Sequence, residues 1–160
     1  MTSFGDLYSR HSADVFRFAL YLSGNRTEAE DITSETFVRA WTAPAPIRMA
    51  TVKGYLFTIA RNLFLQGRRK ASRQVELSED LRDPGAGPHA GAEHDSELAA
   101  ALVALQKLPE VDRAALLMRA HDELPYEEIA RALGISLASV KVKIHRARLA
   151  LARIRDESRG

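Results

Sequence analysis

The stretch 126–151 constrains the fold of this chain more than any other part of the sequence. Apolar side chains recur there at helical spacing as far as Leu133, Gly134 then supplies a C-cap, and Ser136 can cap a second helix. The second helix has an apolar stripe made of Leu137, Val140, Ile144, Ala147 and Leu151. Its opposite face is small or basic and free of carboxylates, and it comprises Ala138, Ser139, Lys141, Val142, His145 and Arg146.

Two short helices joined by such a turn are typical of a helix-turn-helix, in which the second helix enters the major groove of DNA. The alternative is an ordinary amphipathic hairpin with a solvated basic face. Turn residues, spacing and one-sided charge all agree with DNA binding, and we therefore expect the protein to bind DNA.

Charge is distributed unevenly along the chain, although the net charge is only +2. The segment 138–155 carries cations without any acid, namely Lys141, Lys143, Arg146, Arg148, Arg153 and Arg155. Between Glu76 and Glu97 the sign reverses, and Arg82 is the only cation there. This segregation predicts a partner of one charge at each end of the chain and an acidic spacer between them.

The composition also bears on location. The sequence has no cysteine, which excludes disulfides and thiolate metal sites and is compatible with a reducing cytosol. Its first residues lack the basic start and apolar core of a signal peptide, and no run of about 18 apolar residues occurs. We expect a soluble, cytoplasmic protein without membrane insertion.

In the N-terminal part, the spacing of apolar residues predicts two helices, over 4–22 and 27–41, separated by Gly24 and Asn25. A capping box of Thr27 with Glu30 is expected to start the second helix. The side chains of that helix that can pack inward are Ile32, Phe37, Val38 and Trp41. Those available on its outside are Asp31, Ser34, Glu35 and Arg39.

A longer helix is predicted over 52–73, with Phe57 and Asn62 on its surface and a basic cluster at its end. This cluster comprises Arg68, Arg69, Lys70 and Arg73. Aromatic rings beside cations suit single-stranded nucleic acid, because rings stack on unpaired bases while cations follow the phosphates. The alternative places the aromatic residues Tyr55, Phe57 and Phe64 in the core and the cations in water.

The remaining sequence completes an all-α fold of two small helical domains, 1–75 and 96–160. Between them, 76–95 has few large apolar residues and is predicted to be a flexible acidic linker. Ser96 starts a helix that Pro109 ends, and the next helix, 110–121, should point Arg113 and Arg119 outward.

Three stretches, in this order and spacing, resemble bacterial RNA polymerase sigma factors of the extracytoplasmic-function (ECF) group of the sigma-70 family. AEDITSETFVRAW, at 29–41, is similar to the helix that binds core polymerase. GYLFTIARNLFLQGRRK, at 54–70, resembles the helix that melts the promoter and reads its −10 element. The third, 108–151, resembles the domain that reads the −35 element. The resemblance implies regions 2 and 4 of the family.

The resemblance also implies residue roles. Core polymerase would be bound through its β′ clamp helices by Asp31, Ser34 and Glu35, and Ser34 stands where the family often has Gln. The −10 element would be melted and read by Tyr55, Phe57, Arg61, Asn62, Arg68 and Arg69. The −35 element would be read by Arg119, Ser139, Lys141, Val142, Lys143, His145 and Arg146. Val142 stands where a small polar residue is common, and it can meet a thymine methyl group.

In this family the polymerase supplies the chemistry, so the resemblance implies a non-catalytic subunit without metal or cofactor. Expected partners are core RNA polymerase, through its β′ clamp helices and β flap, together with promoter DNA and an anti-sigma factor.

Two alternatives come from other classes of protein. A stand-alone helix-turn-helix regulator would bind duplex operator tightly without polymerase. A nucleic-acid hydrolase would use the carboxylates of Glu28, Glu30, Asp31 and Glu35 to bind metal. That cluster lacks a histidine and lies on more than one helix face, which argues against it.

Overall fold

The computed structural model describes residues 3–42, 50–77 and 96–159, and these ranges contain helices and no strands. The N-terminal half comprises α1 (Phe4–Ser23), α2 (Arg26–Thr42) and α3 (Val52–Leu77). The C-terminal half comprises α4 (Ser96–Gln106), α5 (Glu110–Ala120), α6 (Tyr126–Leu133) and α7 (Leu137–Arg159). The all-α prediction is confirmed. Most of the predicted acidic linker, 78–95, lies outside the described residues.

The turn between α1 and α2 is built from Gly24 and Asn25. Gly24 ends α1 in the left-handed conformation, at φ 71°, where a side chain would be strained. The side-chain oxygen Oδ1 of Asn25 then accepts a hydrogen bond from the backbone N–H of Glu28 at 2.8 Å, so Asn25 caps α2. The predicted capping box at Thr27 is therefore wrong, and α2 begins one residue earlier than expected.

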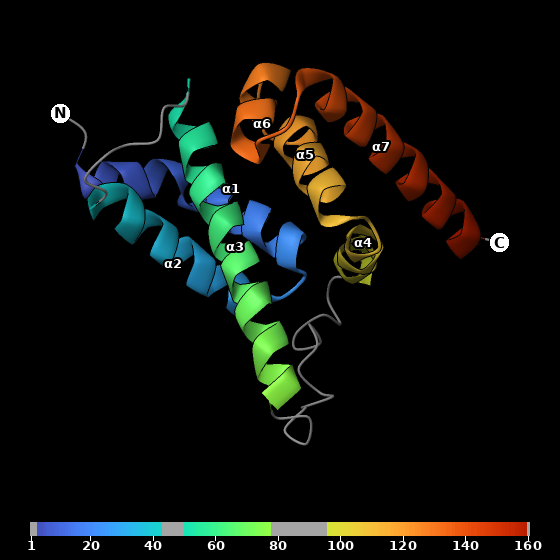
Figure 1. Cartoon of the computed structure of the whole chain (residues 1–160), viewed down its shortest axis with the longest axis horizontal. Coiled ribbons are helices and arrows are strands. Elements are labelled where there is room, and N and C mark those ends of the chain that lie inside the picture. The colour runs from blue at the N-terminus through green and yellow to red at the C-terminus, as the bar shows by residue number, and fades with distance from the viewer. Residues whose placement is uncertain (1–2, 43–49, 78–95, 160) are drawn as a thin grey trace.

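The core of the N-terminal half forms where α3 crosses α1 and α2 (Figure 1). Phe57 lies fully buried there, and its ring stacks on that of Phe18 with the centroids 4.6 Å apart. The expected surface position of Phe57 is wrong, because the ring packs on α1; the alternative that placed Phe57 and Phe64 in the core holds for both residues. Val38 and Trp41, expected to pack inward, are instead exposed.

The C-terminal half contains the predicted helix-turn-helix in α6 and α7. Gly134 ends α6 at φ 68°, and the Ser136 hydroxyl accepts from the backbone N–H of Ser139 at 3.1 Å, as the sequence predicted. Arg113, expected to face outward, is buried in α5, where its guanidinium donates to the carbonyls of Leu105 and Leu108. It thereby ties the α4–α5 turn to α5.

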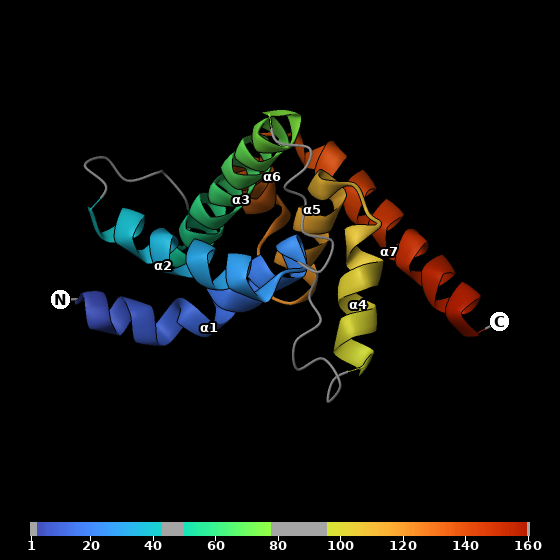
Figure 2. The same cartoon turned by 90° about the horizontal axis from the view of Figure 1, so that it is seen from below.

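The two halves pack directly against each other. α1 contacts α4 and α5, and α3 contacts α6, so that α6 lies between α3 and α7 (Figures 1 and 2). Buried apolar side chains from both halves join in one continuous core, which includes Phe18 and Phe64 on one side and Leu105 and Met118 on the other. No described helix combines the length and apolar character needed to cross a membrane.

Candidate nucleic-acid interface

The outer face of α7 presents the residues that the sequence assigned to duplex recognition. Lys141, Val142 and His145 are exposed, and Val142 reaches 59% exposure. Ser139 is half-buried beside the cap that begins the helix. Behind this face Val140, Ile144 and Ala147 are buried and fix the rotation of α7. The helix can therefore present an aliphatic side chain and cations to one ligand.

Two cations of α7 are held by a carboxylate that sequence reasoning did not identify. Asp112 on α5 is only 1% exposed and accepts two hydrogen bonds from Arg146, at 2.8 Å from Nε and 3.0 Å from Nη2. The Lys143 ammonium lies 3.8 Å from the same carboxylate. The hydrogen bonds to Asp112 raise the pKa of Arg146 above its ordinary value. Asp112 thus orients the basic side of α7.

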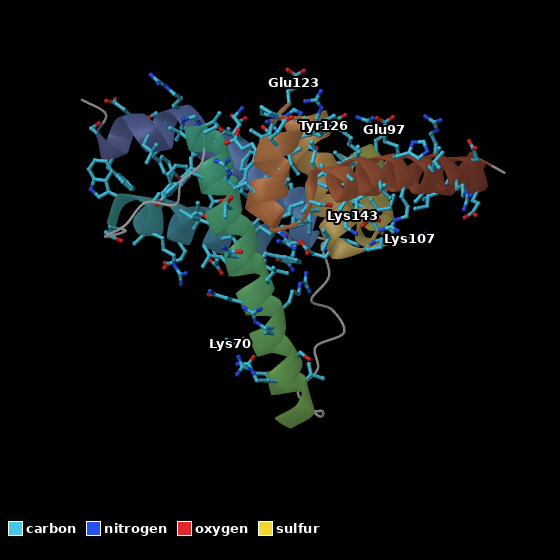
Figure 3. The ribbon with its side chains drawn as sticks, turned by 45° about the horizontal axis from the view of Figure 1, so that its top comes forward. Lys70, Glu97, Lys107, Glu123, Tyr126 and Lys143 are labelled. Atoms are coloured by element: carbon cyan, nitrogen blue, oxygen red, sulfur yellow. The ribbon has the colours of Figure 1, made fainter. Side chains whose placement is uncertain are left out.

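Arg119 lies beside this face on α5 and is half-buried. Its guanidinium donates to the carbonyl of Leu124 at 3.1 Å and lies 4.5 Å from the ring centroid of Tyr126. The Lys141 ammonium approaches the same ring at 5.9 Å. Tyr126 therefore contacts one cation from α5 and one from α7 through its ring. Figure 3 shows Tyr126 at the start of α6.

The single-strand residues predicted on α3 fall into different environments. Asn62 and Arg69 are exposed, and Tyr55 is half-buried. Arg68 donates to the carbonyl of Ser23 at 3.1 Å and lies 4.8 Å from the ring centroid of Phe64. The last turns of α3, which carry Lys70, project beyond the packed helices (Figure 3). The basic end of α3 is therefore accessible.

Arg61, also predicted to contact DNA phosphates, is occupied within the protein. It is 8% exposed and forms a two-point ion pair with Glu110 of the C-terminal half, at 2.8 Å from Nε and 2.7 Å from Nη2. The expectation that Arg61 is free for nucleic acid does not hold in this conformation. Glu110 was not singled out from the sequence, where it reads as an ordinary first-turn acid of α5.

The predicted polymerase-binding residues of α2, Asp31, Ser34 and Glu35, are all exposed. Glu35 pairs with Arg39 at 3.1 Å along the same helix. Beside them lies an exposed aromatic cluster that sequence reasoning missed: Trp41 is 52% exposed and packs edge-on against Phe4, with centroids 5.7 Å apart. A groove of about 360 Å³ between α1 and α2 joins this surface, lined by Tyr8, Ser12, Ala13, Phe16, Glu30, Thr33 and Ser34.

A charged cluster spans the two halves around Lys53 of α3. The Lys53 ammonium lies 3.4 Å from Asp14 of α1 and 3.5 Å from Asp122, which follows α5. Burial raises the pKa of Asp122 above its usual range, with Lys53 opposing that shift. Burial also acts to raise the pKa of Asp14, but Lys53 and Arg17 more than cancel it, and the net pKa is lowered.

Possible metal ligands do not gather anywhere in the described ranges 3–42, 50–77 and 96–159, where no three carboxylate, histidine or cysteine side chains are grouped for an ion. Two of the carboxylates that a nucleic-acid hydrolase would use to bind metal instead lie near arginine side chains. Glu28 lies 3.5 Å from Arg68, and Glu30 lies 3.8 Å from Arg26. Burial raises the pKa of Glu28, which Arg68 opposes.

The arrangement matches known proteins over both halves. Residues 7–74 match the family of sigma-70 region 2, and residues 98–151 match sigma-70 region 4. The ECF RNA polymerase sigma factor SigE of Mycolicibacterium smegmatis is 40% identical over 153 residues, which cover 92% of this chain and 60% of that relative. SigM of Bacillus subtilis, another ECF sigma factor, is 32% identical over 149 residues, covering 89% of each chain.

Two solved structures also match this chain. The sigma factor RpoE of Bartonella quintana, in complex with the anti-sigma factor NepR, matches with a TM-score of 0.83 at 26% identity, over 98% of both chains. CnrH, in complex with the cytosolic domain of CnrY, matches with a TM-score of 0.73 at 26% identity, over 96% of this chain and 88% of that one. The chain is thus a sigma-70-type protein with regions 2 and 4. It belongs to the ECF group of RNA polymerase sigma factors.

Proposed function

We propose that this protein directs core RNA polymerase to promoters by reading the −35 element with α7 and the −10 element with α3. The exposed basic face of α7, held in register by the buried Asp112, carries this proposal. Its membership of the ECF group supports the same function.

Reading of the −35 element is assigned to Ser139, Lys141, Val142, Lys143, His145 and Arg146, with Arg119 as a flanking contact. Lys141 and His145 can donate to base edges or phosphates in the major groove. Val142 offers an apolar surface to a thymine methyl group, and its high exposure suits that contact. Arg146 can reach DNA from a fixed position, since Asp112 holds its guanidinium while leaving the side chain exposed.

Reading and opening of the −10 element are assigned to α3. The Asn62 amide can both donate to and accept from the edge of an unstacked base. Arg68 and Arg69, near the projecting end of the helix, would bind backbone phosphates. Unstacking one base costs a few kcal/mol, and capture of that base would offset the cost. The buried Phe57 is not available for stacking in this conformation, and half-buried Tyr55 is the better aromatic candidate.

Binding of core polymerase is assigned to Asp31, Ser34 and Glu35, which would contact the β′ clamp helices, while the C-terminal half would contact the β flap. The exposed aromatic cluster around Trp41 adjoins this face and would extend it. The two halves would act as separate modules on the promoter, joined through 78–95. The polymerase supplies all catalysis in this scheme, which operates in the cytoplasm.

Because two structural relatives are solved with partners, one of them the anti-sigma factor NepR, we include an anti-sigma factor among the partners.

The direct test is transcription in vitro with purified core polymerase, comparing wild-type protein with Asn62→Ala. We expect the variant to form open complexes roughly tenfold less well, because an amide contact to a base is lost. Binding to core polymerase should not change. Gln66→Ala, at an exposed position one turn along α3, is the matched control. Permanganate footprinting measures strand opening.

Equal loss of core binding and strand opening would show that Asn62 is structural. Failure of the wild-type protein to select any start site would refute the proposed function. Tight binding to duplex DNA without polymerase would instead favour the stand-alone regulator.

A further inference from the structure

The N-terminus of α3 is completed by a side chain from the other half of the protein. Glu128 of α6 is 4% exposed, and its Oε1 accepts hydrogen bonds from the backbone N–H of Thr51 at 2.8 Å and from the Thr51 hydroxyl at 2.6 Å. The same hydroxyl accepts from the backbone N–H of Gly54 at 2.9 Å. Glu128 and Thr51 together therefore cap α3, although they lie far apart in the sequence.

The contact is favourable for two physical reasons. A carboxylate at the start of a helix interacts with the positive end of the helix dipole and with unpaired N–H groups. Gly54 also leaves room for it: a Cβ atom placed there would lie 2.7 Å from Cδ of Glu128 and would overlap Oε1. A Cβ atom at this position must displace the Glu128 carboxylate, whose Oε1 is the atom that accepts from Thr51.

Further polar contacts close the same interface. The Arg61–Glu110 ion pair joins α3 to α5, and the Gln106 amide of α4 donates to the carbonyl of Tyr21 at 3.0 Å. Lys53 reaches Asp122 at 3.5 Å. Specific polar contacts of this kind stabilise one arrangement and can be exchanged for contacts with another partner.

This closed arrangement is incompatible with simultaneous reading of two promoter elements. α3 and α7 are separated by α6 alone (Figures 1 and 2), which places their axes about 20 Å apart at ordinary helix spacing. The −10 and −35 elements are separated by about 25 base pairs, or about 85 Å of duplex. The interface between α3 and α6 must therefore open before both elements are bound.

The Glu128 carboxylate also carries a cost in the closed state. Its second oxygen, Oε2, is buried and finds no hydrogen-bond donor within the described parts of the chain. An unpaired buried acceptor destabilises the state that contains it. Opening the interface would return this oxygen to water, so the capping contact is favourable without making closure irreversible.

We propose that Glu128, seated on Thr51 and Gly54, is a latch that keeps the free protein closed and withholds Arg61 from nucleic acid until the halves separate. This inference rests on the proposed function for its biological meaning. Core polymerase and promoter would open the latch because they bind only the separated halves.

Gly54→Ala tests the latch with little other disturbance, because alanine favours the helix more than glycine does. The protein has no native cysteine, so spin labels can be attached through Thr27→Cys on α2 and Glu127→Cys on α6, both at exposed positions. Double electron–electron resonance then measures the distance between the two labels, and so between the halves. Gly67→Ala is the matched control, because it lies on the same helix with no atom of the C-terminal half among its close neighbours.

We expect a narrow distribution for the wild type and Gly67→Ala, and for Gly54→Ala an added population at a distance longer by about 10 Å or more, one helix layer. Glu128→Ala should give the same lengthening. An unchanged distribution in both variants, or a wild type already as broad as Gly54→Ala, would overturn the latch.

Affinity for core polymerase provides the regulatory readout. If closure competes with binding, Gly54→Ala should lower the apparent Kd for core enzyme by about tenfold, and Gly67→Ala should not. Equal affinities for the wild type and Gly54→Ala would overturn the regulatory role. A latch seen by resonance in a protein that directs no transcription would support the latch and refute the proposed function. Normal transcription by the wild type, with distances unchanged in the variants, would support the proposed function and refute the latch.

Discussion

At the scale of single residues, Asp112 links the stability of the helix-turn-helix to its charged surface. Its buried carboxylate accepts two hydrogen bonds from Arg146 and lies near Lys143. Removing Arg146 leaves this carboxylate with Lys143, at 3.8 Å, as its remaining cation among the ion pairs of the described chain. Lys141, in contrast, is exposed and makes its described contact with the Tyr126 ring. The two cations should therefore respond differently to truncation.

We expect Arg146→Ala to weaken −35 recognition by the holoenzyme and also to lower the Tm, by about 3 °C or more, because a buried acceptor loses its donors. Lys141→Ala should weaken −35 recognition by a similar factor, about fivefold, and leave the Tm nearly unchanged. Fluorescence anisotropy with a labelled promoter and thermal unfolding by circular dichroism measure the two effects. Equal Tm values would show that the Asp112–Arg146 pair does not stabilise the fold.

At the scale of elements, local sequence rules predict most of the helices. Gly24 and Gly134 end helices in the left-handed conformation, as expected of glycine after an amphipathic run. The start of α2 was less predictable, because Asn25 and Thr27 are both good N-cap residues. The structure uses Asn25, which directly follows the C-cap glycine and so makes the shorter turn.

Capping by Asn25 is testable by truncation. Asn25→Ala should lower the free energy of unfolding by about 1 kcal/mol, because the backbone N–H of Glu28 loses its acceptor. Thr27→Ala, at an exposed position inside the helix, should change it by less than about 0.5 kcal/mol. Urea denaturation followed by circular dichroism measures both. A larger effect at Thr27 would restore the capping box expected from the sequence.

Contacts between the halves govern the behaviour of the whole molecule, and they were not predictable from the sequence. Helical periodicity tells which face of a helix is apolar but not which helix covers it. Glu110 and Glu128 therefore read as ordinary first-turn acids, although Glu110 pairs with Arg61 of α3 and Glu128 with Thr51 just before that helix. Phe57 was misplaced for the same reason, since its ring is covered by Phe18 of α1, a neighbour that periodicity does not identify. Exposure of Asn62 and of the α7 face was predictable because local pattern decides it.

A shared core and polar interface should make the two halves unfold together. We expect one calorimetric transition for the wild type, with a ratio of calorimetric to van't Hoff enthalpy near one. Glu110→Gln leaves the buried guanidinium of Arg61 without its ionised partner, and the ratio should rise above one as the halves uncouple. Glu97→Gln, at an exposed position on α4, is the control. Two transitions in the wild type would show that the halves are already independent.

The closed molecule covers its two proposed nucleic-acid surfaces unequally. Lys141, Val142 and His145 face solvent, whereas Arg61 is held by Glu110. An unassembled molecule can thus present its outer helix to upstream duplex while one cation of the proposed strand-opening helix, Arg61, is engaged within the protein. Under the proposed function, this inequality would favour recruitment first, with DNA unwound only where the transcribing enzyme is already present.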